Sequence, residues 1–157
     1  MNRMMIAALG TALAAMTPSL ALAQAAPVEL VGDVKVDRVV VENGTEKHVL
    51  TEPGVVVPGD ALLFTTQYRN AGTVAIKNFV VTNPLPEAVV LSAEGADQLI
   101  VSVDGGKSFG KLAALRVTGT DGKARPAQAG DVTHIRWVLP VLAPGGSGAL
   151  SYHATVR

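Results

Sequence analysis

Short runs of alternating apolar and polar residues follow one another along most of this chain, and turn residues separate the runs. The clearest run covers residues 61–69, where Leu62, Phe64 and Tyr68 fall on one face. No window keeps a helical period for longer than a turn or two. The pattern therefore predicts an all-β fold, an immunoglobulin-like antiparallel β-sandwich with two sheets and about seven to nine strands.

The first apolar segment, residues 28–42, changes the phase of its alternation partway along. The two sets of apolar positions are Leu30, Val34, Val36 and then Val39, Val41. A β-bulge shifts the side chains of a strand by one residue in this way. We therefore predict a bulge near Asp37-Arg38, and a tight turn at Asn43-Gly44 where the segment ends.

The last two predicted strands alternate most regularly, and the turn Ala143-Pro144-Gly145-Gly146 separates them. If they pair as a hairpin around this turn, Trp137 lies opposite Leu150 and Ile135 opposite Tyr152, all on the apolar face. We expect Trp137 at the centre of the sandwich, because burying an indole ring contributes about 3 kcal/mol. The predicted core positions are Val34, Val36, Leu62, Phe64, Tyr68, Val81, Ile135, Trp137, Leu150, Tyr152 and Val156.

The N-terminal residues have the pattern of a secretory signal peptide. Arg3 supplies a positive n-region, an apolar stretch follows, and Ala21-Leu22-Ala23 is an A-x-A cleavage signal, with a second site two residues further on. The apolar run is shorter than the roughly 20 residues of a spanning helix, and Pro18 interrupts it. We predict a signal peptide over residues 1–23 and one domain over residues 24–157, soluble and exported to the periplasm, the cell surface or the medium.

Cysteine content and charge narrow the picture further. The chain has no cysteine, so the exported domain must fold without disulfides. Removal of Arg3 with the signal peptide leaves 13 − 1 = 12 Lys and Arg against 13 Asp and Glu. A net charge near zero gives no electrostatic reason to expect a nucleic-acid partner or an anionic membrane surface.

Several turn and core motifs form a recognisable set: Pro58-Gly59-Asp60, Tyr68-Arg69-Asn70-Ala71-Gly72, Val80-Val81-Thr82-Asn83-Pro84-Leu85-Pro86 and Leu142-Ala143-Pro144-Gly145. This set resembles the bacterial family called domain of unknown function eleven. Residues 102–109 and 131–137 are similar to its single-domain periplasmic branch in Gram-negative bacteria. The resemblance covers residues 28–157 and implies an immunoglobulin-type module of exported or cell-surface proteins. The tandem arrays of longer relatives are not implied, because the chain holds one copy of the pattern.

One segment of the chain fits the Asp-box pattern S-x-D-x-G-x-[ST]-[WF]. Ser102-Val103-Asp104-Gly105-Gly106-Lys107-Ser108-Phe109 resembles the hairpin that recurs in sialidases and other propellers. The resemblance implies a structural turn in which the aspartate side chain accepts hydrogen bonds from backbone amides of its own loop. A single box in a chain too short for a propeller predicts no activity.

His134 and His153 are candidate metal ligands. The hairpin register sets them opposite each other on the outward face, close enough to share copper or zinc. A firm site needs three or four ligands, and nothing in the sequence places His48 nearby. A solvated or hydrogen-bonded histidine pair is the alternative interpretation.

Neither nucleophilic nor acid–base catalysis has a recognisable motif here. The stretch from Gly145 to Ala149 lacks the final glycine of G-x-S-x-G, and the carboxylates are scattered over turns and strand ends. We therefore expect a protein that is not an enzyme and that carries no cofactor.

Val39-Val40-Val41 is apolar on both faces of the first strand. Such a run is typical either of a strand buried in a sandwich or of a sheet edge that accepts another chain. The sequence predicts a non-catalytic interaction module of the cell envelope that binds a protein or envelope partner through loops or a sheet edge, self-association included. The alternative is a small periplasmic metal-binding or carrier protein that uses the pair His134 and His153.

Overall fold

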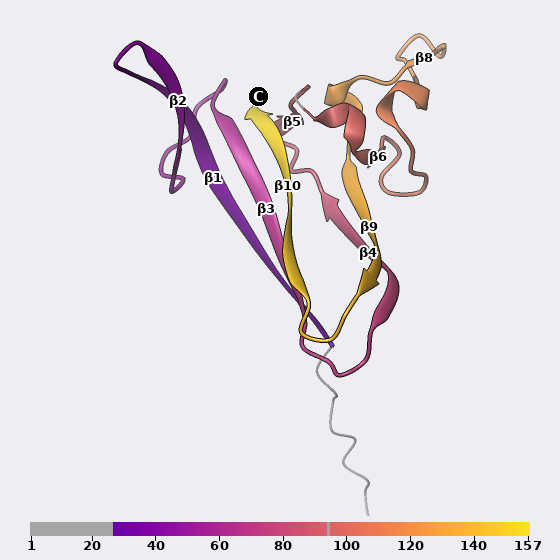
Figure 1. Ribbon diagram of the computed structural model, residues 1–157. Helices are drawn as coiled ribbons and strands as arrows, with labels where there is room; N and C mark the ends of the chain where they lie inside the picture. The colour runs from indigo at the N-terminus through magenta and orange to yellow at the C-terminus, as the bar shows by residue number, and fades with distance from the viewer. Residues whose placement is uncertain (1–26, 94) are drawn as a thin grey trace, which may run out of the picture.

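The computed structural model describes residues 27–93 and 95–157 of the chain (Figure 1). The predicted signal peptide over residues 1–23 lies outside the described residues. The elements are, in order, β1 (Val28–Glu42), β2 (Thr45–Thr51), β3 (Ala61–Asn70), β4 (Ile76–Pro84), β5 (Val89–Leu91), η1 (Ala96–Gln98), β6 (Ile100–Ser102), η2 (Leu112–Ala114), β7 (Arg116–Thr118), β8 (Ala124–Pro126), η3 (Ala129–Asp131), β9 (His134–Leu142) and β10 (Ser147–Val156).

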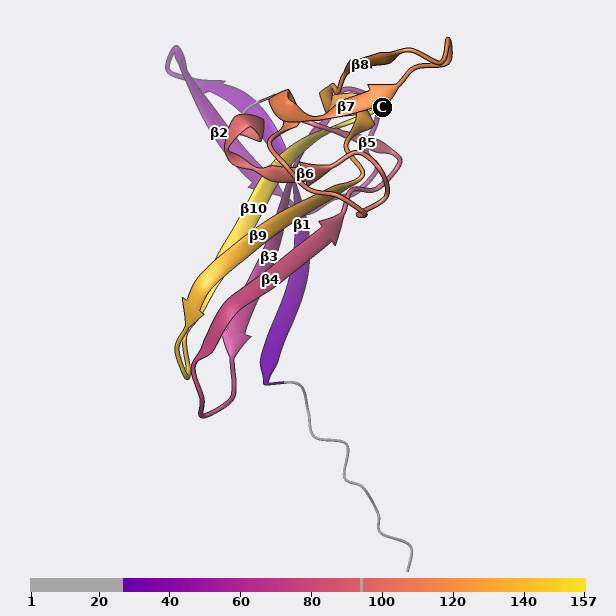
Figure 2. The same cartoon turned by 90° about the vertical axis from the view of Figure 1, so that its right-hand side faces the viewer.

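Two antiparallel sheets face each other across the core. One has five strands in the order β2-β1-β3-β10-β5, and the other has three in the order β4-β9-β6. The first lies on the left of Figure 1 and the second on the right, and the small hairpin of β7 and β8 lies at the upper end of both views (Figures 1 and 2). The predicted all-β sandwich is confirmed. In the described part of the chain, no helix has the length and apolar character required to cross a membrane.

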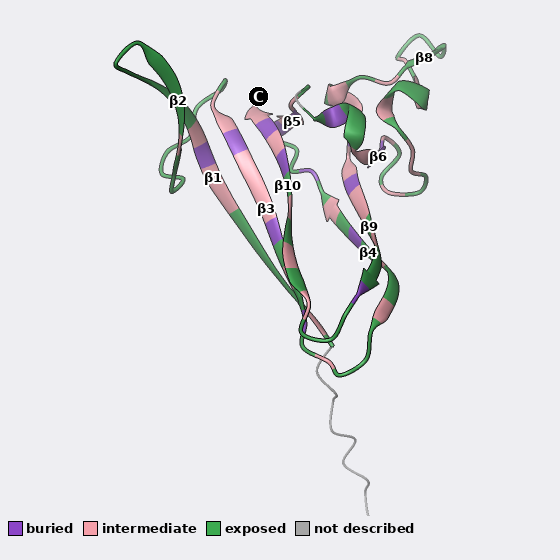
Figure 3. Ribbon diagram, in the orientation of Figure 1, coloured by how far each residue is buried: buried purple, intermediate pink, exposed green. Residues whose placement is uncertain are grey.

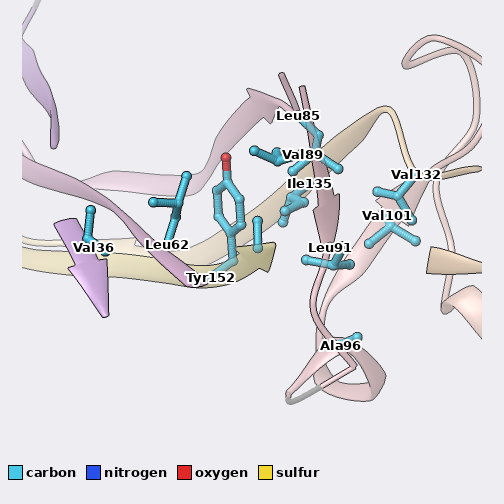
Figure 4. Close-up of a cluster of buried hydrophobic side chains, with 11 residues drawn as sticks. Val36, Leu62, Leu85, Val89, Leu91, Ala96, Val101, Val132, Ile135 and Tyr152 are labelled. Atoms are coloured by element: carbon cyan, nitrogen blue, oxygen red, sulfur yellow. The ribbon is translucent and has the colours of Figure 1, made fainter. Parts of the chain in front are cut away.

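Aromatic side chains link the two sheets. The rings of Phe64 and Tyr152, which are neighbours in the five-stranded sheet, stack with centroids 4.9 Å apart and planes 2° from parallel. Trp137 reaches the same group from the three-stranded sheet, with its centroid 6.2 Å from that of Tyr152. Ile135 is fully buried and belongs to the same core cluster as Tyr152 (Figure 4). Burial raises the pKa of Tyr152 to about 12, because the phenolate would lose its hydration.

The predicted core is largely confirmed. The five buried positions are Val36, Leu62, Val81, Ile135 and Tyr152. Four more are partly buried against the core cluster, namely Val34, Phe64, Trp137 and Val156. Tyr68 and Leu150 are half-buried and lie outside that cluster. In Figure 3 the buried positions occur as separate purple bands along strands of both sheets.

The predicted hairpin of the last two strands is wrong. β9 pairs with β4 and β6 in one sheet, whereas β10 pairs with β3 and β5 in the other. Trp137 therefore lies opposite Val81, and Tyr152 lies opposite Phe64. Two consecutive strands with apolar faces can bury them side by side in one sheet or face to face across a core, and alternation alone does not distinguish these arrangements.

Asn70, at the end of β3, holds β9 and β10 in the arrangement in which they face each other across the core. Its side chain is fully buried, and its amide nitrogen donates to the carbonyls of Val74 at 2.9 Å and Leu142 at 3.1 Å. Its backbone N–H donates to the carbonyl of Gly146, and its carbonyl accepts the N–H of Gly145. Two of the connections that cross between the sheets, from β3 to β4 and from β9 to β10, are thus bound to one residue.

The predicted bulge near Asp37-Arg38 is also wrong. β1 keeps an unbroken register with β3 over Val28–Asp37 and with β2 over Val36–Glu42. The strand does not shift its backbone where the apolar phase changes, so Val39 and Val41 point away from the core and stay exposed.

A real irregularity lies in the other sheet, at Asn78. This residue has a φ of 51°, in the left-handed region, and it has no partner in the β4–β9 register. Pro140 occupies the facing position, and proline has no N–H to donate. The less exposed positions of β4 change phase across Asn78. Ile76 is half-buried before it, whereas Phe79 and Val81 are the less exposed positions after it.

Asn70→Ala should lower the free energy of unfolding by about 2–4 kcal/mol, because two carbonyls near the core lose their donor. Chemical denaturation followed by Trp137 fluorescence measures the change. Thr73→Ala, an exposed position in the same connection, is the control and should stay within about 0.5 kcal/mol of wild type. Equal stabilities for the two variants would contradict the role of Asn70.

Candidate interaction surface

β1 extends beyond its neighbour β3 and forms a projecting hairpin with β2, which we call the arm (residues 38–51). The pairing of β1 with β3 ends at Asp37, whereas its pairing with β2 continues to Glu42. Asn43 and Gly44 close the hairpin with φ angles of 52° and 77°, as a two-residue turn of type I′ requires. The arm stands clear of the other strands at the upper left of Figure 1.

Large apolar side chains are exposed along the arm. The exposed fractions are 53% for Val39, 40% for Val40 and 70% for Val41 on β1, and 50% for Leu50 on β2. The whole arm beyond its base is drawn as exposed in Figure 3. From Arg38 onward, the side of β1 that faced β3 has no paired strand in the described residues. Exposed apolar residues on an unpaired strand edge are typical of a surface that accepts another chain.

Polar contacts at its base attach the arm to the sheet. The ring Nδ1 of His48 lies 2.9 Å and 3.1 Å from the two carboxylate oxygens of Asp37, whose side chain is only 7% exposed. Lys35 donates a hydrogen bond to Glu52 just below, and this bond raises the pKa of the Lys35 ammonium. One contact joins β1 to β2, and the other joins β1 to Glu52, which follows β2. Both hold the hairpin together without covering its apolar residues.

A hollow of about 590 Å³ lies beside the base of the arm, where β3 begins. Arg38 and Val39 line one side of it, Val55 and Val57 of the following loop line another, and Asp60 lies just before β3. The Asp60 carboxylate accepts the backbone N–H of Val57 at 2.9 Å, which fixes the shape of that loop. The unpaired edge of β1 therefore faces open space rather than packed side chains.

The Asp-box segment is a structural turn, as the sequence predicts. One carboxylate oxygen of Asp104 accepts the backbone N–H groups of Lys107 and Ser108, both at 3.0 Å, and the other accepts the Ser108 hydroxyl. The buried Ser102 hydroxyl donates to the same carboxylate. These hydrogen bonds, with that of the Ser108 hydroxyl the largest cause, hold the pKa of Asp104 well below its usual range. The carboxylate is engaged within its own loop.

The two candidate metal ligands lie in different sheets. His134 is the first residue of β9. Its ring packs on the Asp104 loop, about 3.5 Å from the position that a Cβ on Gly106 would occupy. His153 lies in β10 opposite Leu63, on the outward face of the five-stranded sheet. The register that placed the two histidines side by side is wrong, so metal binding by this pair loses its geometric argument. Within residues 27–93 and 95–157, no group of three or more His, Cys, Asp or Glu side chains could hold a metal ion.

The sequence pointed to Val39-Val40-Val41 but left open whether the run is buried. The predictions from the sequence did not include Leu50 in the same surface, or the hollow beside the arm. The signal for Leu50 was present in the Asn43-Gly44 turn, because this turn sets Asp37 opposite Leu50 on the face that carries Val39 and Val41. The hollow depends on a loop that no local pattern describes.

Comparison of the chain with protein-family models, with curated proteins and with solved structures found no match. The resemblance to domain of unknown function eleven therefore stays a prediction.

Asp104→Asn should lower the thermal unfolding midpoint at neutral pH, because an amide accepts weaker hydrogen bonds than a carboxylate. The folded-state pKa of Asp104 lies below its ordinary value of 3.8. The stabilisation that the ionised Asp104 carboxylate gives the folded protein is therefore complete above pH 3.8, and it is lost as the pH falls toward the folded-state pKa. The gap between wild type and variant should be constant from pH 7 to about pH 5 and shrink below about pH 4. Asp97→Asn is the control, and a gap that stays constant down to pH 3 would contradict the assignment.

Proposed function

We propose that this protein is a non-catalytic, exported interaction module of the bacterial cell envelope, which binds a protein or envelope partner through the arm. The observation that supports it is the row of exposed valines, Val39 to Val41, on the edge of β1 away from β2, where no described strand pairs with it. A soluble domain rarely keeps such a surface unless another surface covers it.

The chemistry of the arm suits strand addition. The edge of β1 offers unpaired N–H and C=O groups, and each backbone hydrogen bond contributes about 0.5–1.5 kcal/mol net. The valines add burial on both faces, because successive side chains of a strand alternate in direction. An extended segment from a partner would gain both terms at once, and the sandwich below would act as a rigid base.

Export and the absence of catalysis belong to the same proposal. The signal-peptide pattern of residues 1–23 supports transport out of the cytoplasm, and a disulfide-free domain suits the periplasm as well as the cell surface. The Asp104 carboxylate, whose pKa is held well below its usual range, is bound within its own loop. The family resemblance agrees with a module of this class.

Chemical cross-linking in intact envelopes tests the proposal. Wild type should give reproducible adducts, and the pair Val39→Lys with Val41→Lys should reduce them to background, because two charges now stand where apolar contact is needed. Both positions are more than half exposed, so the pair should fold with wild-type stability.

The matched control is the pair Val74→Lys with Val141→Lys, which are 72% and 62% exposed and lie away from the arm. It should keep the wild-type adducts. Mass spectrometry then identifies each adduct. The proposal fails if wild type forms no reproducible adduct, or if the arm variant and the control behave alike.

A further inference from the structure

The unpaired edge of β1 has a self-complementary sequence. Its five residues are Arg38, Val39, Val40, Val41 and Glu42, and all five are exposed. A positive charge and a negative charge lie at equal distances from the central Val40. Such a segment can pair with an antiparallel copy of itself, because each end then meets the opposite charge.

The pleat of the strand agrees with this pairing. About a two-fold axis at Val40, Val40 lies opposite Val40 of the second copy, and Arg38 lies opposite Glu42 of the second copy. These three positions share one face, because their numbers have the same parity. Val39 lies opposite Val41 of the second copy on the other face. Every cross-strand pair is thus either apolar with apolar or positive with negative.

Neighbouring registers lose this match. A two-fold axis at Val39 sets Arg38 opposite Val40, and an axis at Val41 sets Glu42 opposite Val40. Each of these registers places charged side chains against valines and forms no ion pair between Arg38 and Glu42. Charge therefore selects the register centred on Val40.

The hollow at the base of the arm fits the same register. With Glu42 of the second copy opposite Arg38, the pairing stops just before Asp37, whose facing position is taken by Ala61 of β3. There the hollow of about 590 Å³ lies between Arg38, Val39 and the residues before β3. The turn of each copy must therefore leave the plane of the sheet at this point, beside the hollow of the other copy.

The other open stretches of β1 and β2 do not match themselves in the same way. Along β2, an axis at Lys47 opposes two lysines, an axis at His48 sets Glu46 opposite Leu50, and an axis at Val49 sets Glu46 opposite Glu52. On the side of β1 away from β3, where β2 has ended, an axis at Val31 opposes Glu29 and Asp33. Like charges directly opposite each other disfavour pairing.

We propose that the arm binds a second copy of this chain, forming a two-fold dimer in which the arms pair antiparallel along β1 with Val40 on the axis. The inference rests on the proposed function, since it names the partner of the same arm. Such an interface is isologous and closed, so it covers the exposed edge without starting a fibre. It is also small, so the dimer should form at high local concentration and dissociate on dilution.

A disulfide at the axis tests the register. The natural chain has no cysteine, so Val40→Cys introduces a single thiol in protein purified from envelopes after expression of the full sequence. Opposed residues of antiparallel strands have Cβ atoms about 5 Å apart, within reach of a disulfide. Mild oxidation should convert most of the variant to a covalent dimer. Val141→Cys, at a site 62% exposed, is the control and should remain mostly monomeric.

Charge reversal tests the ion pairs independently. Arg38→Glu and Glu42→Arg each create two like-charge contacts, so each should raise the dimer dissociation constant about tenfold or more in sedimentation velocity. The double variant restores opposite charges and should return to within about threefold of wild type. Glu42 also lies 3.6 Å from Lys47, so Lys47→Gln serves as the control for that contact.

The outcomes separate the inference from the proposed function. Preferential cross-linking of Val40→Cys together with rescue by the double variant supports the dimer. A wild type that is monomeric at every concentration, or equal cross-linking of Val40→Cys and Val141→Cys, overturns it. If arm-dependent envelope adducts with a different protein persist in that case, the interaction module stands and only the identity of its partner is wrong. If those adducts are missing as well, both proposals fall.

Discussion

A single buried amide, Asn70, decides how the strands of this protein can be arranged. Its side chain donates to the carbonyls of Val74 and Leu142, and its backbone exchanges hydrogen bonds with Gly145 and Gly146. The connections from β3 to β4 and from β9 to β10, two of those that cross between the sheets, are bound at this point. β3 and β10 must then run side by side in one sheet, while β4 and β9 form the other. The stacking of Phe64 on Tyr152 and the approach of Trp137 follow from that arrangement.

The opposite end of the five-stranded sheet has a different character. There β1 and β2 extend past the start of β3, so nothing in the described residues pairs with the last part of β1 on that side. A strand edge of this kind is a hazard to a soluble protein, and charged residues at its ends limit uncontrolled association. Arg38 and Glu42 flank the valines of the arm in this way. Their opposite signs also give the edge a preferred register, so the same residues that protect it can specify a partner.

Local patterns predicted much of the strand content correctly, and they failed where pairing depends on distant residues. The Asn43-Gly44 turn and the Asp104 loop formed as expected, because backbone conformation and side-chain hydrogen bonds within four residues determine them. The supposed hairpin of β9 and β10 failed, although its alternation was the most regular in the chain. The supposed bulge in β1 failed because the apolar phase change reflects outward-facing valines rather than a shift of the backbone.

The sequence by itself therefore determined the positions of most strands, the residues that face the core within each strand, and the chemistry of the tight turns. Tertiary structure decided which strands are neighbours, that His134 and His153 belong to different sheets, and that Val39 and Val41 remain exposed. The physical reason is the range of the interactions involved. Alternation and turns act between residues a few positions apart, whereas the hydrogen bond from Asn70 to Leu142 joins residues 72 positions apart, and no local pattern encodes it.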